Sequence, residues 1–83
     1  MKNPPPPAVG DVFKGPRTNS RKTHGTYHVR AIVDNEGEDP EYGWMYQVVF
    51  RFWSPRKGWR YQVEDASALG VGLYKRQSRK TST

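Results

Sequence analysis

Two runs of alternating side chains, residues 44–53 and 59–64, dominate the hydrophobic pattern of this chain. The sequence SPRKG stands between them, in which proline presets the φ angle of a turn and glycine can adopt the left-handed conformation that closes one. The pattern therefore predicts a long β-hairpin. If residues 55–58 form its loop, Trp53 lies opposite Arg60.

The predicted hairpin has two different faces, because successive side chains of a strand point to opposite sides. One face is apolar and is expected to form the core: Trp44, Tyr46, Val48, Phe50, Phe52, Tyr61 and Val63. The other face is mixed, with two arginines beside an indole: Met45, Gln47, Val49, Arg51, Trp53, Arg60 and Gln62. The hairpin is thus expected to supply both the core and the functional surface.

Shorter patterns before the hairpin predict two further strands. Residues 10–14 indicate a short strand, and residues 26–34 indicate a longer one. In the longer strand, Tyr27, Val29, Ala31 and Val33 are expected on one face and His28, Arg30 and Ile32 on the other. Residues 15–25 lack aliphatic side chains, and residues 35–43 are rich in glycine and acids, so both segments are expected to be loops.

After the hairpin, residues 65–70 predict one helical turn of 3₁₀ type, and residues 71–75 predict a last short strand. Both chain ends differ from this pattern. Residues 1–9 contain four consecutive prolines, which favour a stiff, solvated and extended leader. Residues 76–83 lack an apolar anchor and are expected to be a disordered basic tail, which leaves residues 10–75 as the domain.

The order of these elements resembles the plan of SH3-like small barrels, in which a helical turn precedes the last strand. The resemblance covers residues 10–75 and is carried by element order, not by a family motif. It implies an all-β fold, a small five-stranded SH3-like barrel. A five-stranded OB-like barrel is the alternative. Since small barrels carry many unrelated activities, the fold alone does not indicate function.

Charge and composition narrow the partners. The chain has 83 residues, 14 lysines and arginines against 8 acids, and a net charge of +6. Because most of the acids lie within residues 34–41, the remaining surface is strongly basic, which favours a polyanion such as nucleic acid. The chain has no cysteine and no apolar run approaching the roughly 20 residues of a membrane span, so a cytoplasmic protein without a membrane partner is expected.

The mixed hairpin face suggests nucleic-acid binding. An indole among guanidinium groups can stack on bases while the cations contact phosphates, and a basic hairpin tip can instead enter a duplex groove. The expected contact residues are Arg17, Arg21, Lys22, Arg51, Trp53, Arg56, Lys57 and Arg60. In the competing interpretation, Trp53 covers a small apolar patch with Met45 and Val49, and Arg60 lies over it.

Other functional classes find less support. The spacing of the acids does not match a calcium-binding loop, and His24 and His28 lack a third ligand nearby for zinc, so no metal or other cofactor is expected. No catalytic motif or phosphate-binding glycine loop is present, so neither an enzyme nor a small-molecule substrate is expected. The alternative function is a protein-interaction module, adaptor or inhibitor, that engages an acidic protein surface or another macromolecule through its separated charges and exposed aromatics.

Overall fold

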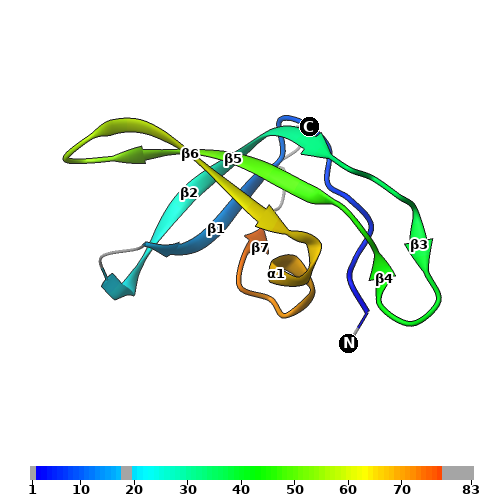
Figure 1. Ribbon diagram of the computed structural model, residues 1–83. Coiled ribbons are helices and arrows are strands. Elements are labelled where there is room, and N and C mark those ends of the chain that lie inside the picture. Colours follow the sequence, from blue (N-terminus) through cyan, green and yellow to red (C-terminus); the bar gives the residue numbers. More distant parts are fainter. Residues whose placement is uncertain (1, 18–19, 78–83) are drawn as a thin grey trace, which may run out of the picture.

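The computed structural model describes residues 2–17 and 20–77, with the side chains of all of these except residues 17 and 20–24. The chain is mostly β, as predicted, with one helical turn (Figure 1). In chain order, the elements are β1 (Val12–Arg17), β2 (Ser20–Val33), β3 (Glu38–Asp39), β4 (Gly43–Trp44), β5 (Gln47–Ser54), β6 (Gly58–Asp65), α1 (Ala66–Gly70) and β7 (Lys75–Arg76). None of the described helices is long and apolar enough to cross a membrane.

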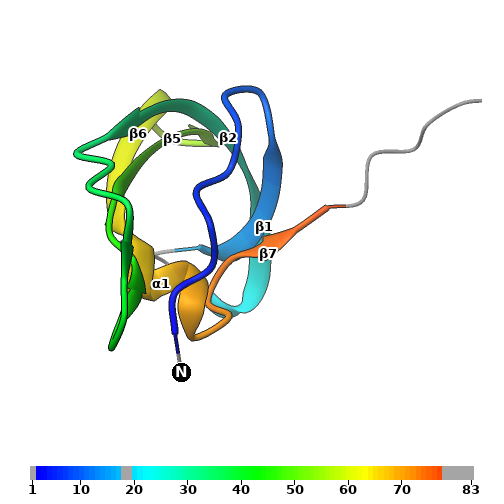
Figure 2. The same cartoon turned by 90° about the vertical axis from the view of Figure 1, so that its right-hand side faces the viewer.

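Five strands form one antiparallel sheet in the order β6-β5-β2-β1-β7, and β3 pairs with β4 in a separate two-stranded sheet. Seen along its strands, the five-stranded sheet curls around a central core, with α1 lying at its open side (Figure 2). The end strands β6 and β7 do not pair with each other. The all-β class is therefore confirmed, whereas the sheet is open and does not close into the expected barrel.

Strands β1 and β2 extend into the segment that was expected to be a loop. They pair from Val12↔His28 to Arg17↔Ser20, so most of residues 15–25 is strand. Aliphatic side chains are not required here, because glycines face each other at Gly15↔Gly25 and the ring of Tyr74 lies directly against Gly15. The missing side chains leave room for an aromatic ring, which the hydrophobic pattern does not indicate.

A β-bulge in β2 changes the predicted faces of that strand. The pairing with β5 shifts between Val29↔Phe50 and Ala31↔Val49, and one extra residue, Arg30, stands between these pairs. Beyond a bulge, the alternation of side chains is reversed. Ile32 therefore packs against the core, while Ala31 and Val33 lie on the other face, contrary to the strict alternation predicted from the sequence.

The hairpin β5-β6 forms as predicted, but its register differs by one residue. The loop is residues 55–57, since Gly58, at φ 76°, already pairs with Ser54. A shift of one residue moves every side chain of a strand to the opposite face. Tyr61 and Val63, expected in the core, are consequently 62% and 55% exposed.

The core is built around aromatic rings from several strands rather than from the hairpin alone. Its buried residues are Phe13, Tyr27, Val29, Tyr46, Val48, Phe50, Ala66 and Tyr74, with Ile32, Trp44, Phe52, Ala68 and Leu69 packed against them. Tyr74 takes the place expected for Tyr61: its ring stacks on Phe50 with 4.8 Å between centroids. Tyr74 directly precedes β7, which keeps only Lys75 of the predicted final strand and adds Arg76. Arg76 pairs with Phe13, and Gln77 donates its N–H to the carbonyl of Val12, so the start of the expected disordered tail is ordered instead.

The hydroxyl of Tyr74 lies under the inner face of β6. It accepts a hydrogen bond of 2.7 Å from Nε2 of Gln62, and the carboxylate of Glu64 also hydrogen-bonds to it. Burial, followed by the hydrogen bond and negative charge of Glu64, raises the pKa of Tyr74 well above its ordinary value. Polar side chains of β6 thus cover the core from this side.

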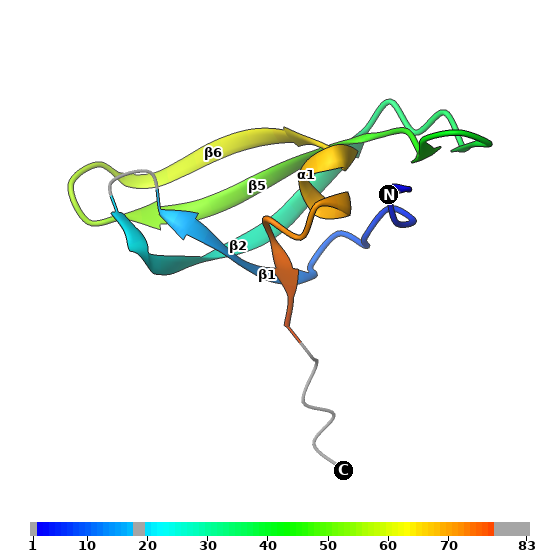
Figure 3. The same ribbon diagram turned by 90° about the horizontal axis from the view of Figure 1, so that it is seen from below.

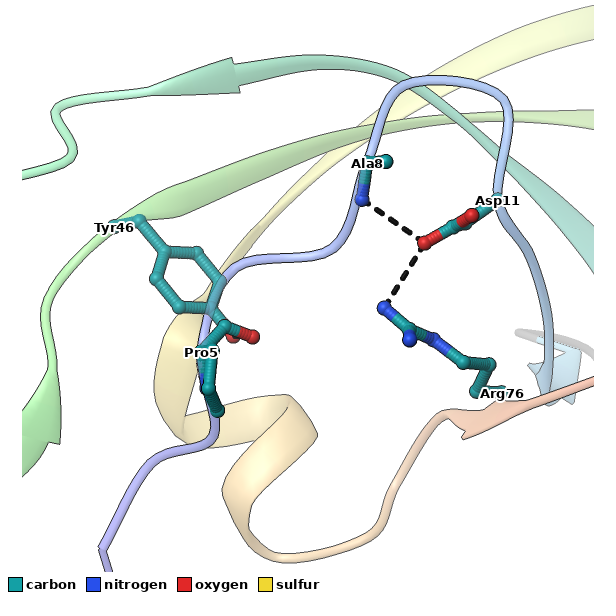
Figure 4. Close-up of polar contacts among 5 residues, drawn as sticks. All are labelled: Pro5, Ala8, Asp11, Tyr46 and Arg76. Carbon is teal, nitrogen blue, oxygen red and sulfur yellow. Dashed lines mark hydrogen bonds and ion pairs between the residues drawn. The ribbon is translucent and has the colours of Figure 1, made fainter.

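The proline leader crosses one end of the curled sheet, from α1 to the start of β1 (Figure 2). Asn3 exchanges backbone hydrogen bonds with the β3-β4 hairpin, its N–H reaching the carbonyl of Tyr42 at 2.8 Å, and Pro7 is buried. Figure 4 shows the end of the leader at Asp11, whose Oδ2 accepts from the Ala8 N–H at 2.9 Å and pairs with Arg76 at 2.9 Å. These contacts place the leader against the domain, where a solvated segment was expected.

The remaining elements follow the sequence in position. Residues 66–70 form one α-helical turn, not the expected 3₁₀ turn, and the buried Ala66 donates its N–H to the carbonyl of Tyr46 at 2.9 Å. Within the predicted acidic loop, β3 and β4 form a small hairpin. Residues 78–83 of the expected basic tail, which include Arg79 and Lys80, lie outside the described residues, and the domain limits stay a prediction.

Candidate functional site

The outer face of strands β2, β5 and β6 is turned away from the core and gathers aromatic and cationic side chains. On β5, Val48 and Phe50 are buried, so Arg51 and Trp53 point outward. Residues directly opposite each other in paired strands share a face. The register therefore places His28 and Tyr61 on either side of Arg51, and Trp59 opposite Trp53.

These five residues are here called the outer-face cluster, and three of them, Arg51, Trp53 and His28, contact the ring of Trp59. The guanidinium carbon of Arg51 lies 4.1 Å from the centroid of the Trp59 ring, a cation–π contact. Trp53 meets Trp59 edge to face, with 5.4 Å between centroids and 76° between planes. His28 approaches the same ring, at 6.4 Å and 66°. Trp59 thus connects four planar groups from three strands, and Tyr61 lies on the same face, opposite Arg51.

Much of this aromatic surface is open to solvent. Trp53 is 55% exposed, Trp59 is 48% exposed and Tyr61 is 62% exposed. Large aromatic side chains usually bury most of their area, and an exposed group of them indicates a binding surface more often than a single exposed residue does. The competing interpretation, in which Trp53 covers an apolar patch with Val49, leaves these exposed fractions unexplained.

A small cavity of about 230 Å³ lies beside the cluster. Its lining combines the ring of Trp59 with three basic side chains, those of His28, Arg30 and Arg51. The other lining residues are Val9, Gly10 and Val29. Pockets for drug-sized ligands typically measure about 300–1,000 Å³, so this one suits a single planar ring or a phosphate group. It opens where the β2 bulge turns Arg30 outward.

Arg51 carries a polar atom without a partner in this region. Its Nε is buried and makes no hydrogen bond to any residue that the structure describes. A buried donor left unpaired costs about 1–3 kcal/mol, so this position of the Arg51 side chain is set by its contact with the Trp59 ring at the expense of a hydrogen bond. The guanidinium is thus fixed above Trp59 with one of its donors unused.

The sequence-predicted contact residues divide into three groups. Arg51 and Trp53 lie together in the outer-face cluster, and Arg56 and Lys57 are exposed at the hairpin tip beyond it. Arg60 was expected opposite Trp53 but lies opposite Phe52, on the other face of the sheet, because of the changed register. The side chains of Arg17, Arg21 and Lys22 lie outside the described residues.

Four residues of this surface were not expected from the sequence: His28, Arg30, Trp59 and Tyr61. Trp59 occupies the position predicted for Arg60, opposite Trp53. Gly58 was the one indication of this register in the sequence, because it can pair with Ser54 after a loop of residues 55–57 as well as end a loop of residues 55–58. The bulge that exposes Arg30 has no comparable signal in the residue pattern.

The acidic segment forms a separate surface at the other end of the molecule. Oδ1 of Asp39 accepts the backbone N–H groups of Tyr42 and Glu41 at 3.0 and 2.8 Å, and these bonds hold the pKa of Asp39 below its ordinary value. Among residues 2–17 and 20–77, no group of three or more His, Cys, Asp or Glu side chains is arranged to hold a metal ion. The carboxylate of Asp39 therefore stabilises the local turn through these two hydrogen bonds.

Comparisons with known proteins found no relative from which a function could be taken. No protein-family model matches the chain, and neither the curated proteins nor the solved structures that were compared with it gave a match.

Proposed function

We propose that this protein is a non-catalytic module that binds single-stranded nucleic acid on its outer-face cluster. The observation that carries the proposal is the exposed pair Trp53 and Trp59, which meet edge to face, with the guanidinium of Arg51 over the Trp59 ring. Single-stranded nucleic acids bind such surfaces because their unpaired bases stack on aromatic rings and on guanidinium planes.

Charge supports the same choice of ligand. The net charge is +6, and the cluster continues into Arg56 and Lys57 at the exposed hairpin tip and into Arg30 at the β2 bulge. Cations placed on both sides of an aromatic surface can follow a phosphate backbone while bases stack between them. The guanidinium of Arg51 adds charged donors for a phosphate or base oxygen beside the Trp59 ring.

A single strand fits this surface better than a duplex does. The aromatic rings lie on the body of the sheet, where only splayed-out bases can reach them, whereas a duplex keeps its bases stacked. A duplex-groove mode would depend on the hairpin tip alone, with Arg56 and Lys57 leading. The tip supplies electrostatic attraction for a single strand and for a duplex alike. Only the binding of a single strand also uses the aromatic rings of the outer-face cluster.

The finer fold assignment is part of the same proposal. We infer an open variant of the SH3-like small barrel, on the basis of five strands in one curled sheet and a helical turn before the last strand. The gap between β6 and β7 separates it from a closed barrel. Small barrels of this plan present one sheet face to solvent, which is the face that carries the cluster.

Fluorescence titration of the full chain with single-stranded DNA, RNA and duplex oligonucleotides at two salt concentrations tests the function. Of the three tryptophans in the chain, Trp53 and Trp59 lie in the site and provide the binding signal. Trp59→Ala and Trp53→Ala are each expected to weaken single-strand binding by about 1–3 kcal/mol, and the affinity of the wild type should fall steeply as salt rises. An affinity no better than millimolar at low salt for all three ligands would overturn the proposal.

Two matched controls separate the cluster from general effects of charge and aromatic content. Tyr42→Ala removes a 58% exposed aromatic ring in the acidic segment and should leave binding unchanged. Arg51→Gln and Arg60→Gln remove the same charge from opposite faces of the sheet, so the first should weaken single-strand binding more. Equal losses for the two arginine variants would indicate attraction by net charge without a site.

A second candidate, a protein-interaction module, is favoured by one further observation. The outer face continues from the aromatic cluster to Val33 and Val63, which are 39% and 55% exposed. Such an apolar extension is typical of protein interfaces. Purification of the chain from nuclease-treated extract distinguishes the two functions, because a stoichiometric protein that remains bound after nuclease supports the second and loss of all bound material supports the first.

A further inference from the structure

Strand β6 forms one edge of the five-stranded sheet and is eight residues long. Its pairing with β5 is continuous, from Ser54↔Gly58 to Gln47↔Asp65, without a bulge. Within the described part of the chain, no other strand pairs with it, and the view from below shows β6 along the outside of the sheet (Figure 3). A regular edge of this length is a template for another strand.

Strand β6 lacks two of the usual protections of an edge, a bulge and a proline, and carries charges near both ends. Natural edge strands are commonly blunted by bulges, prolines or charges along their length. Strand β6 has no proline, and its outer face carries the exposed Tyr61 and Val63. Its other face carries Arg60 and Glu64, of which neither forms an ion pair with any described residue. The edge thus offers aromatic and apolar side chains on the outer face, with Asp65 at its end, and two opposite charges on the inner face, where Glu64 also hydrogen-bonds to Tyr74.

We propose that a second copy of this chain pairs with β6 edge to edge, in antiparallel orientation. Hydrogen-bonding groups on an edge strand point outward at every second residue. Because two identical strands present the same positions, residue numbers of opposed residues must add to an even value. This condition leaves only a few registers. In each of them, a residue of the outer face lies opposite an outer-face residue of the partner.

The charges select one register among these. When Gln62 of both copies lies on the two-fold axis, Arg60 stands opposite the partner's Glu64, and the reverse pair forms at the same time. Tyr61 then stands opposite the partner's Val63, again twice. Opposite-charge pairs and aromatic–β-branched pairs are both favourable across strands.

The neighbouring register lacks this complementarity. With Tyr61 on the axis, Arg60 stands opposite the partner's Gln62, and Glu64 stands opposite the partner's Gly58, so neither charge has a counterpart. The two-fold axis of the favoured register is perpendicular to the sheet, which keeps both outer faces on the same side. The dimer therefore extends one surface across six strands, β2-β5-β6 from each copy. This inference does not depend on the proposed function.

Charge exchange tests the register directly. Sedimentation equilibrium of the full chain should show a monomer–dimer equilibrium, and Arg60→Glu or Glu64→Arg alone should weaken dimerisation about tenfold or more, since each variant places like charges opposite each other twice. The double variant with both changes restores the opposite charges and should recover dimerisation relative to either single variant, with circular dichroism showing that chains lacking the Glu64 hydrogen bond to Tyr74 are folded. Lys75→Glu, on the far edge strand β7, is the matched control and should have no effect.

A disulfide provides a second test, which does not rely on charge. The chain has no cysteine, so Gln62→Cys introduces a single thiol that lies next to its symmetry mate only when Gln62 is on the axis. Oxidation should link this variant into dimers, whereas Tyr61→Cys, which reports the neighbouring register, should link far less. Circular dichroism confirms that each variant is folded, since Gln62 also donates to Tyr74.

Three results would overturn the proposal. The first is a wild type that stays monomeric up to about 1 mM. The second is a dimer that Arg60→Glu and Glu64→Arg leave unchanged, which would place the interface elsewhere. The third is efficient linkage of Tyr61→Cys without linkage of Gln62→Cys, which would contradict the register.

Discussion

The hydroxyl of Tyr74 shows how one residue links the core to the edge strand. Its ring packs among Tyr27 and Phe50, with centroid distances of 5.1 and 4.8 Å, and its oxygen meets Gln62 and Glu64 from β6. The same ring lies over Gly15, where any Cβ would collide with it. Packing and hydrogen bonding at this one side chain thus hold β6, β1 and the last strand together.

The raised pKa of Tyr74 predicts a loss of stability at alkaline pH. In the unfolded chain this tyrosine ionises near pH 10, whereas burial and the negative charge of Glu64 keep it neutral in the folded state. Its contribution is therefore fully present below pH 10 and is lost as pH rises above that value, by up to about 1.4 kcal/mol per pH unit.

Chemical denaturation at pH 8 and at pH 11 measures this effect. Tyr74→Phe should be less stable than the wild type at pH 8, because it loses the hydrogen bonds to Gln62 and Glu64, but it should lose less stability between the two pH values. The same drop in both proteins would assign the alkaline sensitivity to other groups.

At the residue scale, the sequence predicts which side chains are inward on β5 but not on β6. Val48 and Phe50 follow directly from alternation. Tyr61 and Val63 do not, because their side depends on whether Gly58 ends the loop or begins the strand, and its positive φ angle of 76° is available in both cases. A single conformational choice at one glycine decides the face of eight residues and replaces Arg60 by Trp59 in the site.

At the scale of elements, the N-terminal leader behaves as an additional segment of the domain. It bridges the β3-β4 hairpin through Asn3 and the β1-β7 end of the sheet through Asp11 and Arg76. Tyr46 donates to the carbonyl of Pro5 at 3.4 Å, a long bond (Figure 4). Because polyproline chains carry no N–H on their prolines, this segment packs by shape and by its carbonyl groups.

Removal of residues 2–7 is therefore expected to destabilise the domain. The truncated chain loses the Asn3 hydrogen bonds and the burial of Pro7, which together should lower the free energy of unfolding by about 1–2 kcal/mol. For a chain of this size, that corresponds to a decrease in Tm of roughly 4–16 °C.

Thermal unfolding followed by circular dichroism measures the decrease. Asp11→Asn is the matched comparison, since it breaks only the ion pair with Arg76, whose side chain is 57% exposed, and should cost under about 1 kcal/mol. An unchanged Tm of the truncated chain would show that the leader contacts contribute no stability.

Elements are predicted well where side chains alternate and poorly where backbone geometry decides. The hairpin, the helical turn and the strand that ends near Val33 follow from the pattern. The β1-β2 extension does not, because it rests on a ring over Gly15 that comes from a distant part of the chain. The bulge at Arg30 and the position of the leader depend on the same kind of long-range packing.

At the scale of the whole molecule, the charges are separated along its length. The acidic β3-β4 segment and the basic tip of the β5-β6 hairpin lie at opposite ends (Figures 1 and 3), and the longest dimension is 41 Å. The sequence shows that the acids are clustered, but it does not show how far they lie from the arginines of the hairpin. That distance determines whether the acidic segment affects the proposed nucleic-acid site.

Ionic screening turns this separation into a prediction for Glu36→Gln, Glu38→Gln and Glu41→Gln combined. These three glutamates are exposed, and Asp39 is retained because its carboxylate holds the local turn. The Debye length is about 30 Å at 0.01 M salt and about 8 Å at 0.15 M. The triple variant should thus bind single-stranded DNA several-fold more tightly than the wild type at the lower salt and equally well at the higher salt.

Titrations at the two salt concentrations distinguish this remote effect from direct contact. Arg56→Gln with Lys57→Gln, at the other end, should weaken binding at both, because these cations are expected to lie within the screening distance of the bound phosphates. If the glutamate variant still differs from the wild type at 0.15 M, the acidic segment lies closer to the ligand than the outer-face cluster allows. The nucleic acid would then extend over the β3-β4 hairpin, and the site would have to be placed along the whole length of the sheet.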